Sequence, residues 1–328
     1  MRKPRLGFLG TGWIGRHRMA AMLDTGLVEA VAVSDPSAEM VAEARALAPD
    51  AAAVGSLDEL LACDLDGVVI ATPSALHAAQ SIAALEAGVA VFCQKPLGRS
   101  AEEAAAVVTA ARGADRLLGV DFSYRFTGGV AAIADLVRGG DLGHVHAVDL
   151  VFHNAYGPDK PWFYDRAQSG GGCVMDLGVH LVDLALWVLD FPAVELVESR
   201  LHAGGAPLAG EAVEDFAVAT LTLATGTVVR LACSWRLHAG CDAVIEASFY
   251  GTDGGAGFRN IGGSFYDFVA DCWRGTHAER LSEGDADWGG RAGADWCRRL
   301  SGGERFGEDA ARLVEVSAAL DAIYAAAR

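Results

Sequence analysis

The chain has 328 residues, which is longer than one average domain and predicts two domains. Hydrophobic residues make up 52% and charged residues 21% of the sequence, so the chain can bury a large core and is not disordered. The formal net charge is −17, and such an acidic surface repels nucleic acid and anionic lipid. We therefore expect a small-molecule protein with no nucleic-acid partner and no membrane partner.

Targeting signals and cysteine usage indicate the compartment. The N-terminal residues are basic, but the apolar run after them spans only residues 6–9, too short for the core of a signal peptide. No stretch approaches the roughly 20 apolar residues of a membrane-spanning helix. The cysteines are odd in number and lack a C-x-x-C pair, which is typical of buried thiols in a reducing compartment. No histidine and cysteine cluster has metal-ligand spacing, so we expect a cytoplasmic protein without a metal site. The cysteines are Cys63, Cys93, Cys173, Cys233, Cys241, Cys272 and Cys297.

The first third of the chain alternates short apolar runs with alanine-rich stretches. The apolar runs are continuous, which is typical of parallel strands buried on both faces. Alternating strands and helices predict a doubly wound α/β domain over residues 1–122. Strands are expected at 5–9, 28–34, 67–71, 89–93 and 117–120, and helices at 14–24, 36–47, 75–87 and 100–112.

A G-x-G-x-x-G motif directly follows the first expected strand and opens the first helix. The first glycine permits a tight turn, the second lets the backbone approach a pyrophosphate, and the third lets helix and strand pack closely. The N-terminus of the helix offers unpaired N–H groups to the phosphates. A glycine-rich turn without function is the alternative. The motif consists of Gly10, Thr11, Gly12, Trp13, Ile14 and Gly15.

Asp35 stands at the end of the second expected strand, 20 residues beyond the last glycine of the motif. A carboxylate there accepts hydrogen bonds from a ribose and repels a 2′-phosphate. No arginine follows in the next three residues, 36–38, to bind such a phosphate. The position therefore predicts NAD rather than NADP.

Two more polar segments follow strands at their carboxyl ends, where ligands bind in open α/β sheets. Ala71, Thr72 and Pro73 end the strand at 67–71, and Gln94 and Lys95 follow the strand at 89–93. A solvated surface lysine is the alternative for Lys95. The proline that follows restricts the backbone and allows a cis bond.

Residues 123–328 have a different sequence pattern, in which long strand candidates are joined by short polar turns. Consecutive strands with tight turns indicate an antiparallel sheet, and flanking helices complete an α+β domain. The strands at 212–223 and 227–235 carry apolar residues on both faces, which predicts an exposed association surface. The other strands are expected at 144–152, 194–201 and 243–250, and the helices at 176–189 and 307–327.

The helix expected at 176–189 follows three glycines at 170–172 and reads D-x-G-x-H-x-x-D. If the helix begins near Asp176, then Asp176 and His180 lie one turn apart on one face, and Asp183 lies near them. A carboxylate beside an imidazole orients it and stabilises its protonated form, so the pair can move a proton near neutral pH. The alternative is an N-capping Asp176 and a histidine packed on the apolar face of the helix.

Together the three motifs resemble the glucose–fructose oxidoreductase/inositol dehydrogenase/rhizopine catabolism (Gfo/Idh/MocA) family over essentially the whole chain. The resemblance implies an NAD-binding Rossmann domain over 1–122. It also implies a substrate-binding and oligomerisation α+β domain over 123–328, built on a large open, mostly antiparallel sheet. The exposed face of that sheet commonly forms dimers or tetramers, so we expect a homodimer or homotetramer.

The resemblance also assigns site residues. Lys95, Asp176 and His180 match the catalytic residues around the reacting carbon. Thr72, Pro73 and His77 match a T-P-x-x-x-H segment beside the nicotinamide, and Arg125 fits the pattern of the domain junction. The cofactor-binding set is then Gly10, Thr11, Gly12, Trp13, Ile14, Gly15, Asp35, Ala71, Thr72, Pro73, His77, Gln94 and Lys95. The substrate-binding set is Lys95, Arg125, Tyr156, Trp162, Asp176 and His180, with Trp162 a candidate sugar-stacking wall.

The chain departs from the family pattern at two positions. Gln94 stands where the family usually has glutamate before Lys95, and Ser123 stands where asparagine is frequent at the junction. Glutamine keeps its hydrogen-bonding capacity but removes a negative charge, which makes protonated Lys95 less favourable.

These observations predict an NAD-dependent oxidoreductase that transfers hydride between nicotinamide and a secondary alcohol carbon of a sugar, cyclitol or related polyol. In oxidation, His180 takes the hydroxyl proton, Asp176 holds and charge-balances it, and Lys95 stabilises the developing alkoxide. Two alternatives stay open: an NAD-dependent glycoside-cleaving enzyme of the same fold, and a non-catalytic dinucleotide-sensing binding protein.

Overall fold

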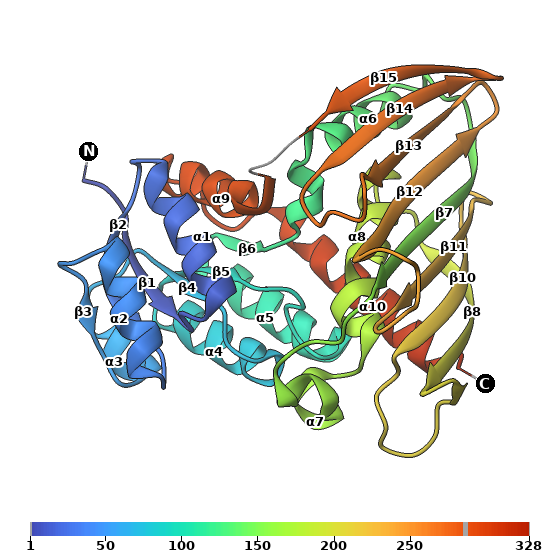
Figure 1. The fold of residues 1–328 in the computed structure, drawn as a ribbon. Helices are drawn as coiled ribbons and strands as arrows, with labels where there is room; N and C mark the ends of the chain where they lie inside the picture. The colour runs from blue at the N-terminus through green and yellow to red at the C-terminus, as the bar shows by residue number, and fades with distance from the viewer. Residues whose placement is uncertain (1, 285–287, 328) are drawn as a thin grey trace. The chain divides into compact units, whose positions relative to one another are not determined.

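The computed structural model describes residues 2–284 and 288–327, which form two compact units (Figure 1). The first unit contains the chain up to Ser123 together with Gly289–Val314, and the second contains Tyr124–Trp288 and the chain from Glu315 onward. The expected single boundary after residue 122 does not describe this path, because the chain returns to the first unit near its end.

The first unit is built on a parallel sheet with the strand order β3-β2-β1-β4-β5-β6. This is the expected doubly wound arrangement, and the order reverses between β1 and β4. Ligands bind beyond the carboxyl ends of the strands at such a reversal. The strands are β1 (Arg5–Leu9), β2 (Glu29–Ser34), β3 (Ala52–Ala53), β4 (Gly67–Ile70), β5 (Ala90–Cys93) and β6 (Leu118–Val120).

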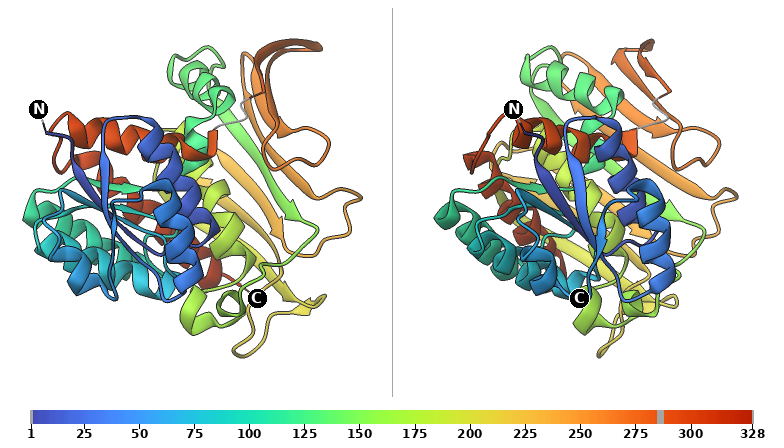
Figure 2. Two further views of the ribbon diagram at one scale, coloured as in Figure 1. Left: turned by 60° about the vertical axis from the view of Figure 1, so that its left-hand side comes forward. Right: turned by 90° about the vertical axis from the view of Figure 1, so that its left-hand side faces the viewer.

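Helices cover both faces of this sheet (Figure 2). The helices α1 and α2 pack against each other on one face, and α4 and α5 pack against each other on the other face, as right-handed crossovers require. The side chains of Ser37, Ser56 and Ser100 cap α2, α3 and α5 by accepting backbone N–H groups. The helices are α1 (Trp13–Asp24), α2 (Ala38–Leu47), α3 (Leu57–Leu61), α4 (Ser74–Glu86) and α5 (Ala101–Ala114).

Residues 289–314 join the first unit through the helix α9 (Arg291–Ser301). The buried ring of Trp296 packs against Phe92, with 5.8 Å between ring centroids. Glycines make room for it on the sheet, because a Cβ at Gly67 or Gly119 would lie 2.6 or 2.7 Å from the indole. The sequence patterns did not predict this helix or its place in the first unit.

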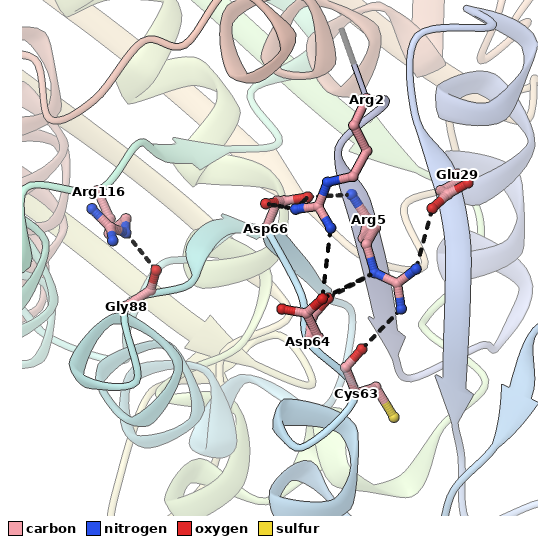
Figure 3. A network of polar contacts seen from close by, with 8 residues as sticks. All are labelled: Arg2, Arg5, Glu29, Cys63, Asp64, Asp66, Gly88 and Arg116. Atoms are coloured by element: carbon pink, nitrogen blue, oxygen red, sulfur yellow. Dashed lines mark hydrogen bonds and ion pairs between the residues drawn. The ribbon is translucent and has the colours of Figure 1, made fainter.

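The amino-terminal edge of the parallel sheet carries a polar network (Figure 3). Asp66, just before β4, accepts the backbone N–H of Arg5 at 2.8 Å and the guanidinium of Arg2 at 2.9 Å. The Arg5 side chain donates to the carbonyl of Asp64 at 2.9 Å and pairs with Glu29 of β2 at 3.4 Å. These contacts tie the starts of three neighbouring strands at the edge opposite the ligand-binding edge.

The second unit is built on a nine-stranded mixed sheet with the order β15-β14-β13-β12-β7-β11-β10-β8-β9. All neighbours are antiparallel except β7 and β11, which confirms the large, mostly antiparallel sheet. The strands are β7 (Val145–Asn154), β8 (Val194–Ala203), β9 (Ala206–Pro207), β10 (Phe216–Leu223), β11 (Val228–Ser234), β12 (Ala243–Gly251), β13 (Gly255–Asn260), β14 (Phe268–Arg274) and β15 (His277–Glu283).

Helices cover one face of this sheet, and α6 (Gly128–Arg138) and α8 (Val179–Val188) contact its strands (Figure 1). The helix α10 (Arg312–Ala325) lies beside β8, where the Ser199 hydroxyl donates to the carbonyl of Ile323 at 2.6 Å. Burial alternates along β10 and β11, so their buried residues face the helices and their other face is solvated. The expectation of apolar residues on both faces is therefore only partly right.

Among the described residues, one helical segment, Arg166–Val188, is long and apolar enough to span a membrane by length and composition. No such stretch was expected from the sequence. Of its most apolar 18 residues, 83% are buried within the protein, which is the behaviour of a core helix.

Candidate functional site

The glycine-rich turn after β1 has the shape that a dinucleotide requires. Gly10 has a φ of +82°, and a Cβ there would lie 2.5 Å from the carbonyl oxygen of Ala71. A Cβ at Gly15 would overlap the carbonyl oxygen of Gly10, so α1 can approach the turn only with glycine at this position. Gly12, in contrast, has open space where its Cβ would be. The backbone of the turn is therefore not covered by a side chain at Gly12, where a pyrophosphate would approach it.

The start of α1 also suits an anion. The helix begins at Trp13 after Gly12, with no side-chain cap and no acidic residue in its first turn. Its first N–H groups are thus left for a ligand. The buried Thr11 hydroxyl has no hydrogen-bond partner among the described residues. An NAD pyrophosphate fits this turn.

Asp35 lies next to the glycine turn and is held by two backbone groups. Its carboxylate accepts the N–H of Thr11 at 2.7 Å and the N–H of Ser37 at 2.9 Å. These bonds fix the carboxylate at the carboxyl end of β2, where the sequence places it. A fixed negative charge there opposes a 2′-phosphate.

The segments after β4 and β5 are joined by the buried ring of His77. Its Nε2 lies 2.7 Å from the carbonyl of Thr72, and its Nδ1 lies 2.7 Å from the carbonyl of Pro96. Burial lowers the pKa of His77, although the two carbonyls act in the opposite direction. A neutral ring has one N–H and donates to one of the two carbonyls at a time. The resemblance places the segment of Thr72, Pro73 and His77 beside the nicotinamide, and in the structure the His77 ring links two loops of the protein.

Thr72 and Lys95 are also placed by these segments. The Thr72 hydroxyl donates to Gln80 of α4 at 2.6 Å. Lys95 is half-buried after β5, its bond to Pro96 is cis, and the preceding Gln94 is buried with its amide donating to Asp121 at 2.5 Å. The residues expected around the nicotinamide therefore lie at the carboxyl edge of the parallel sheet.

In the second unit, Asp176 lies in a π-helical turn, Val174–Gly178, that leads into α8. The sequence predicted one regular α-helix over this segment. In the structure, Asp176 lies in the wider π-helical turn and His180 in the first turn of α8, so the two are not spaced as in a regular α-helix. Asp176 is not an N-cap: its carboxylate accepts the indole N–H of Trp235, at the end of β11, at 3.0 Å. Over residues 171–186, only Asp176 and His180 are not fully buried. The two polar side chains thus emerge together from an otherwise buried helix.

The ring of His180 packs among aromatic side chains. Its centroid lies 5.0 Å from that of Tyr124, edge to face, and 6.2 Å from that of Phe152. Burial raises the pKa of the Tyr124 hydroxyl, so this neighbour stays neutral. The imidazole packs against these rings and keeps part of its surface accessible.

Glu214 explains two of the three glycines before the π-helical turn, Gly171 and Gly172. Its Oε1 accepts the backbone N–H of Gly172 and of Val174 at 2.9 Å each, and the Tyr324 hydroxyl at 2.8 Å. A Cβ at Gly171 would overlap that hydroxyl, and a Cβ at Gly172 would overlap the carbonyl oxygen of Glu214. The glycines therefore let the chain close around a buried carboxylate that holds the turn carrying Asp176.

Arg125 and Asp183 form an ion pair with each other. The Arg125 guanidinium donates to both carboxylate oxygens of Asp183 and lies against the rings of Trp187 and Phe191. Asp183 is therefore not the third member of a cluster with Asp176, as the sequence suggested. Arg125, expected to bind substrate, has its guanidinium engaged within the second unit.

Trp162, the candidate sugar-stacking wall, belongs to an aromatic group near Trp235. Trp162 stacks on Phe163 at 3.8 Å, and Phe163 meets the Trp235 ring edge to face at 6.3 Å. Trp235 also holds Asp176, so the wall and the carboxylate share one residue. Tyr156 is exposed, and its hydroxyl donates to Asp242.

Comparison with known proteins identifies the family. Residues 4–122 match the model of the oxidoreductase family with an NAD-binding Rossmann fold. Residues 130–256 match the GFO/IDH/MocA C-terminal domain.

Curated relatives extend over most of the chain. A 1,5-anhydro-D-fructose reductase of Ensifer adhaerens is 30% identical over 262 residues, covering 78% of this chain and 76% of the relative. An inositol 2-dehydrogenase of Rhodococcus erythropolis is 28% identical over 354 residues and 98% of each chain.

Solved structures share the fold. Levoglucosan dehydrogenase in complex with NADH superposes with a TM-score of 0.85 at 20% identity, over 99% of this chain and 97% of the other. A 3-ketoreductase from Actinomadura kijaniata in complex with NADP gives a TM-score of 0.85 at 22% identity, over 100% and 98%. The chain therefore belongs to the Gfo/Idh/MocA family of oxidoreductases, whose N-terminal domain is an NAD-binding Rossmann fold.

Proposed function

We propose that this protein is an NAD-dependent dehydrogenase acting on a secondary alcohol carbon of a sugar, cyclitol or related polyol. The observation that carries the proposal is the emergence of Asp176 and His180 from a buried helix, the carboxylate fixed by Trp235. The names of the relatives support the substrate class, since they include a 1,5-anhydro-D-fructose reductase, a D-glucoside 3-dehydrogenase of Escherichia coli and inositol 2-dehydrogenases.

In the proposed mechanism, bound NAD supplies the hydride acceptor at C4 of its nicotinamide. During oxidation, His180 takes the hydroxyl proton as general base. Asp176 holds the imidazole and balances its positive charge, and Trp235 keeps that carboxylate in place. Lys95 stabilises the oxygen as negative charge develops on it. With the cofactor bound, the alcohol would give up one hydride to it and one proton to His180, which would leave a ketone.

The same proposal covers the assembly and the compartment. We propose a homodimer or homotetramer formed through the solvated face of the nine-stranded sheet. We also place the enzyme in the cytoplasm, because all seven cysteines are free thiols, as in proteins of reducing compartments.

A substrate screen tests the function. Polyols, aldoses and inositols are supplied with NAD, and NADH is followed by absorbance. We expect turnover with at least one of them and a loss of roughly 10²–10⁴ in His180→Ala, with NAD affinity unchanged.

Two other outcomes would replace the proposal. A sugar released without net NADH would identify a glycoside-cleaving enzyme that uses NAD transiently. NAD binding without any turnover across the screen would identify a dinucleotide-sensing protein.

A further inference from the structure

A buried carboxylate, Asp121, sits at the centre of a polar cluster in the first unit. It accepts the Arg18 Nε at 2.5 Å and the Gln94 Nε2 at 2.5 Å on one oxygen, and the Ser123 hydroxyl on the other. Exposed fractions are 2% for Asp121, 7% for Arg18 and 8% for Gln94. The carboxylate thus has a donor from each of three chain segments and is nearly closed off from solvent.

The three segments are the ones that build the ligand edge. Arg18 belongs to α1, the helix that follows the glycine turn, and Gln94 immediately precedes Lys95. Asp121 and Ser123 follow β6, and the Asp121 N–H donates to the carbonyl of Cys93 at 2.9 Å. One carboxylate therefore connects the cofactor helix to the residue before the lysine.

The charges in the cluster balance. Arg18 is the counter-ion of Asp121, and it also contacts the Ser123 hydroxyl at 3.1 Å and the Nδ1 of His17 at 2.9 Å. Burial raises the pKa of the nearby Cys93 thiol to about 12, so this group is neutral. A buried ion pair adds little stability compared with apolar residues of the same volume, which favours a role in fixing position.

We propose that Asp121 is a positioning residue for Lys95: it holds Gln94 against Arg18 and supplies the carboxylate that position 94 lacks. The inference rests on the role proposed for Lys95. It also revises the expectation that Gln94 removes a negative charge from this region. A glutamate at position 94 would face Asp121 at hydrogen-bonding distance, so glutamine here and aspartate at 121 require each other.

A double-mutant cycle at positions 94 and 121 tests this pairing. Gln94→Glu places two carboxylates beside one arginine, and they must share a proton. Its kcat relative to the unaltered enzyme should fall as the pH rises from about 6 to about 9, as that proton is lost. Asp121→Asn leaves Arg18 unpaired and should lower kcat at every pH. The double variant again has one carboxylate facing one amide beside Arg18. Its kcat should return toward that of the unaltered enzyme, and should be roughly tenfold or more above the value expected from independent effects of the two single substitutions.

A second measurement needs no substrate. The rate at which an amine-reactive reagent labels Lys95, read by peptide mass spectrometry, reports the surroundings of its ammonium group. Asp121→Asn should change that rate about threefold or more, and the double variant should restore it. This keeps the inference testable even if the substrate screen finds no turnover. Asp24→Asn, which removes an exposed carboxylate at the end of α1, is the control and should change neither measurement.

Thermal unfolding of the same variants separates position from stability. Coupling in both the kinetics and the labelling of Lys95 supports the proposal. Coupling in the unfolding midpoint alone would make the cluster purely structural and overturn it. Independent effects of the two substitutions in every measurement, or a pH-independent kcat ratio in Gln94→Glu, would also overturn it.

Discussion

The carboxylate of Asp176 is oriented by a residue that its own helix does not supply. Trp235 Nε1 donates to it at 3.0 Å from the end of β11, and the two residues are 59 positions apart in sequence. The sequence shows Trp235 only as an aromatic residue at the end of an apolar run. No local pattern links it to Asp176, because the contact exists only once the sheet and the π-helical turn have packed together.

Replacing Trp235 with phenylalanine removes this donor and keeps an aromatic ring beside Phe163. We expect kcat to fall roughly threefold to tenfold, because a hydrogen bond of this kind contributes roughly 0.5–1.5 kcal/mol. Steady-state kinetics with a confirmed substrate measure the effect, and NAD affinity should not change. Trp273→Phe, on the solvated face of the sheet, is the matched control. A kcat equal to that of the control would remove Trp235 from the mechanism.

The position of Asp35 was predictable, because it depends on the local spacing of strand, turn and helix, and its role in cofactor choice stays a prediction. We expect NAD to bind at least about tenfold more tightly than NADP, about 1.4 kcal/mol. Asp35→Asn keeps an acceptor for the Thr11 N–H and loses the charge that repels a 2′-phosphate. This substitution should reduce the ratio of NAD affinity to NADP affinity, while NAD affinity itself stays close to its original value. Isothermal titration with both cofactors measures this, and equal affinities in the unaltered protein would refute the assignment.

At the scale of elements, the exposed two-residue strand β3 was not predicted, but the other five strands of the parallel sheet follow closely from the sequence, because they are continuous apolar runs with sharp ends. The last strands of the second unit do not. The strand β13 reads GAGFRN, and its glycines are tolerated because Trp273 of β14 lies across Gly255 and Gly257. The edge strand β15 is exposed and polar, so it has no apolar alternation to detect. Neighbouring strands, rather than local propensity, decide these two elements.

The helix α9 is another element fixed by distant contacts, and its anchor can be tested. Trp296→Ala should lower the free energy of unfolding by roughly 3–5 kcal/mol, because it leaves a cavity over Gly67 and Gly119. Trp296→Phe should cost much less than Trp296→Ala. It keeps an aromatic ring, and the indole N–H that it removes has no partner among the described residues. Urea unfolding measures both. Equal losses in the two variants would argue against a filled cavity as the main contribution.

The outer strands of the large sheet also predict a response to acid. Asp271 of β14 accepts Arg259 at 2.7 Å and Arg280 at 2.6 Å. Burial alone would raise the pKa of Asp271, but these guanidinium groups outweigh it and hold the pKa below its usual value. A lowered folded-state pKa stabilises the protein above about pH 4, and this stability is lost as the pH falls through the folded-state pKa.

The variant Asp271→Asn tests this direction of the dependence of stability on pH. It should be less stable than the unaltered protein at pH 6, and the difference should shrink below about pH 4. Urea unfolding across this range measures the difference. Glu86→Gln, at an exposed position at the end of α4, is the control. A difference that grows as the pH falls would contradict the role of Asp271.

At the scale of the whole molecule, the register of the sheet brings apolar side chains into one row on its solvated face. The pairings align Leu196 with Thr222, Thr222 with Val228, Val228 with Ala147, and Ala147 with Tyr250. Leu196 is 56% exposed, Val228 37% and Tyr250 38%. The next row is polar and contains the ion pair of Arg230 and Asp149. The face is therefore a mixed surface with an apolar stripe, which suits association between copies.

We expect a dimer or tetramer at micromolar concentration by light scattering. Leu196→Glu together with Tyr250→Glu should shift the population toward the monomer, because each charge would be buried in the contact. Leu47→Glu changes a leucine of similar exposure, 44%, on α2 and should leave the mass unchanged. A monomeric unaltered protein would end the proposal that this face mediates assembly.

The return of residues 289–314 to the first unit has a consequence for synthesis and for truncation. The last strand of the first unit ends at Val120, but Trp296 is synthesised only much later. At ribosomal rates of about 5–20 residues per second, the core of the first unit stays incomplete for roughly 10 to 35 s. The second unit in turn lacks most of α10 until the final residues are made. A stop codon near residue 288 would therefore leave two incomplete cores, each exposing apolar surface to chaperones and proteases.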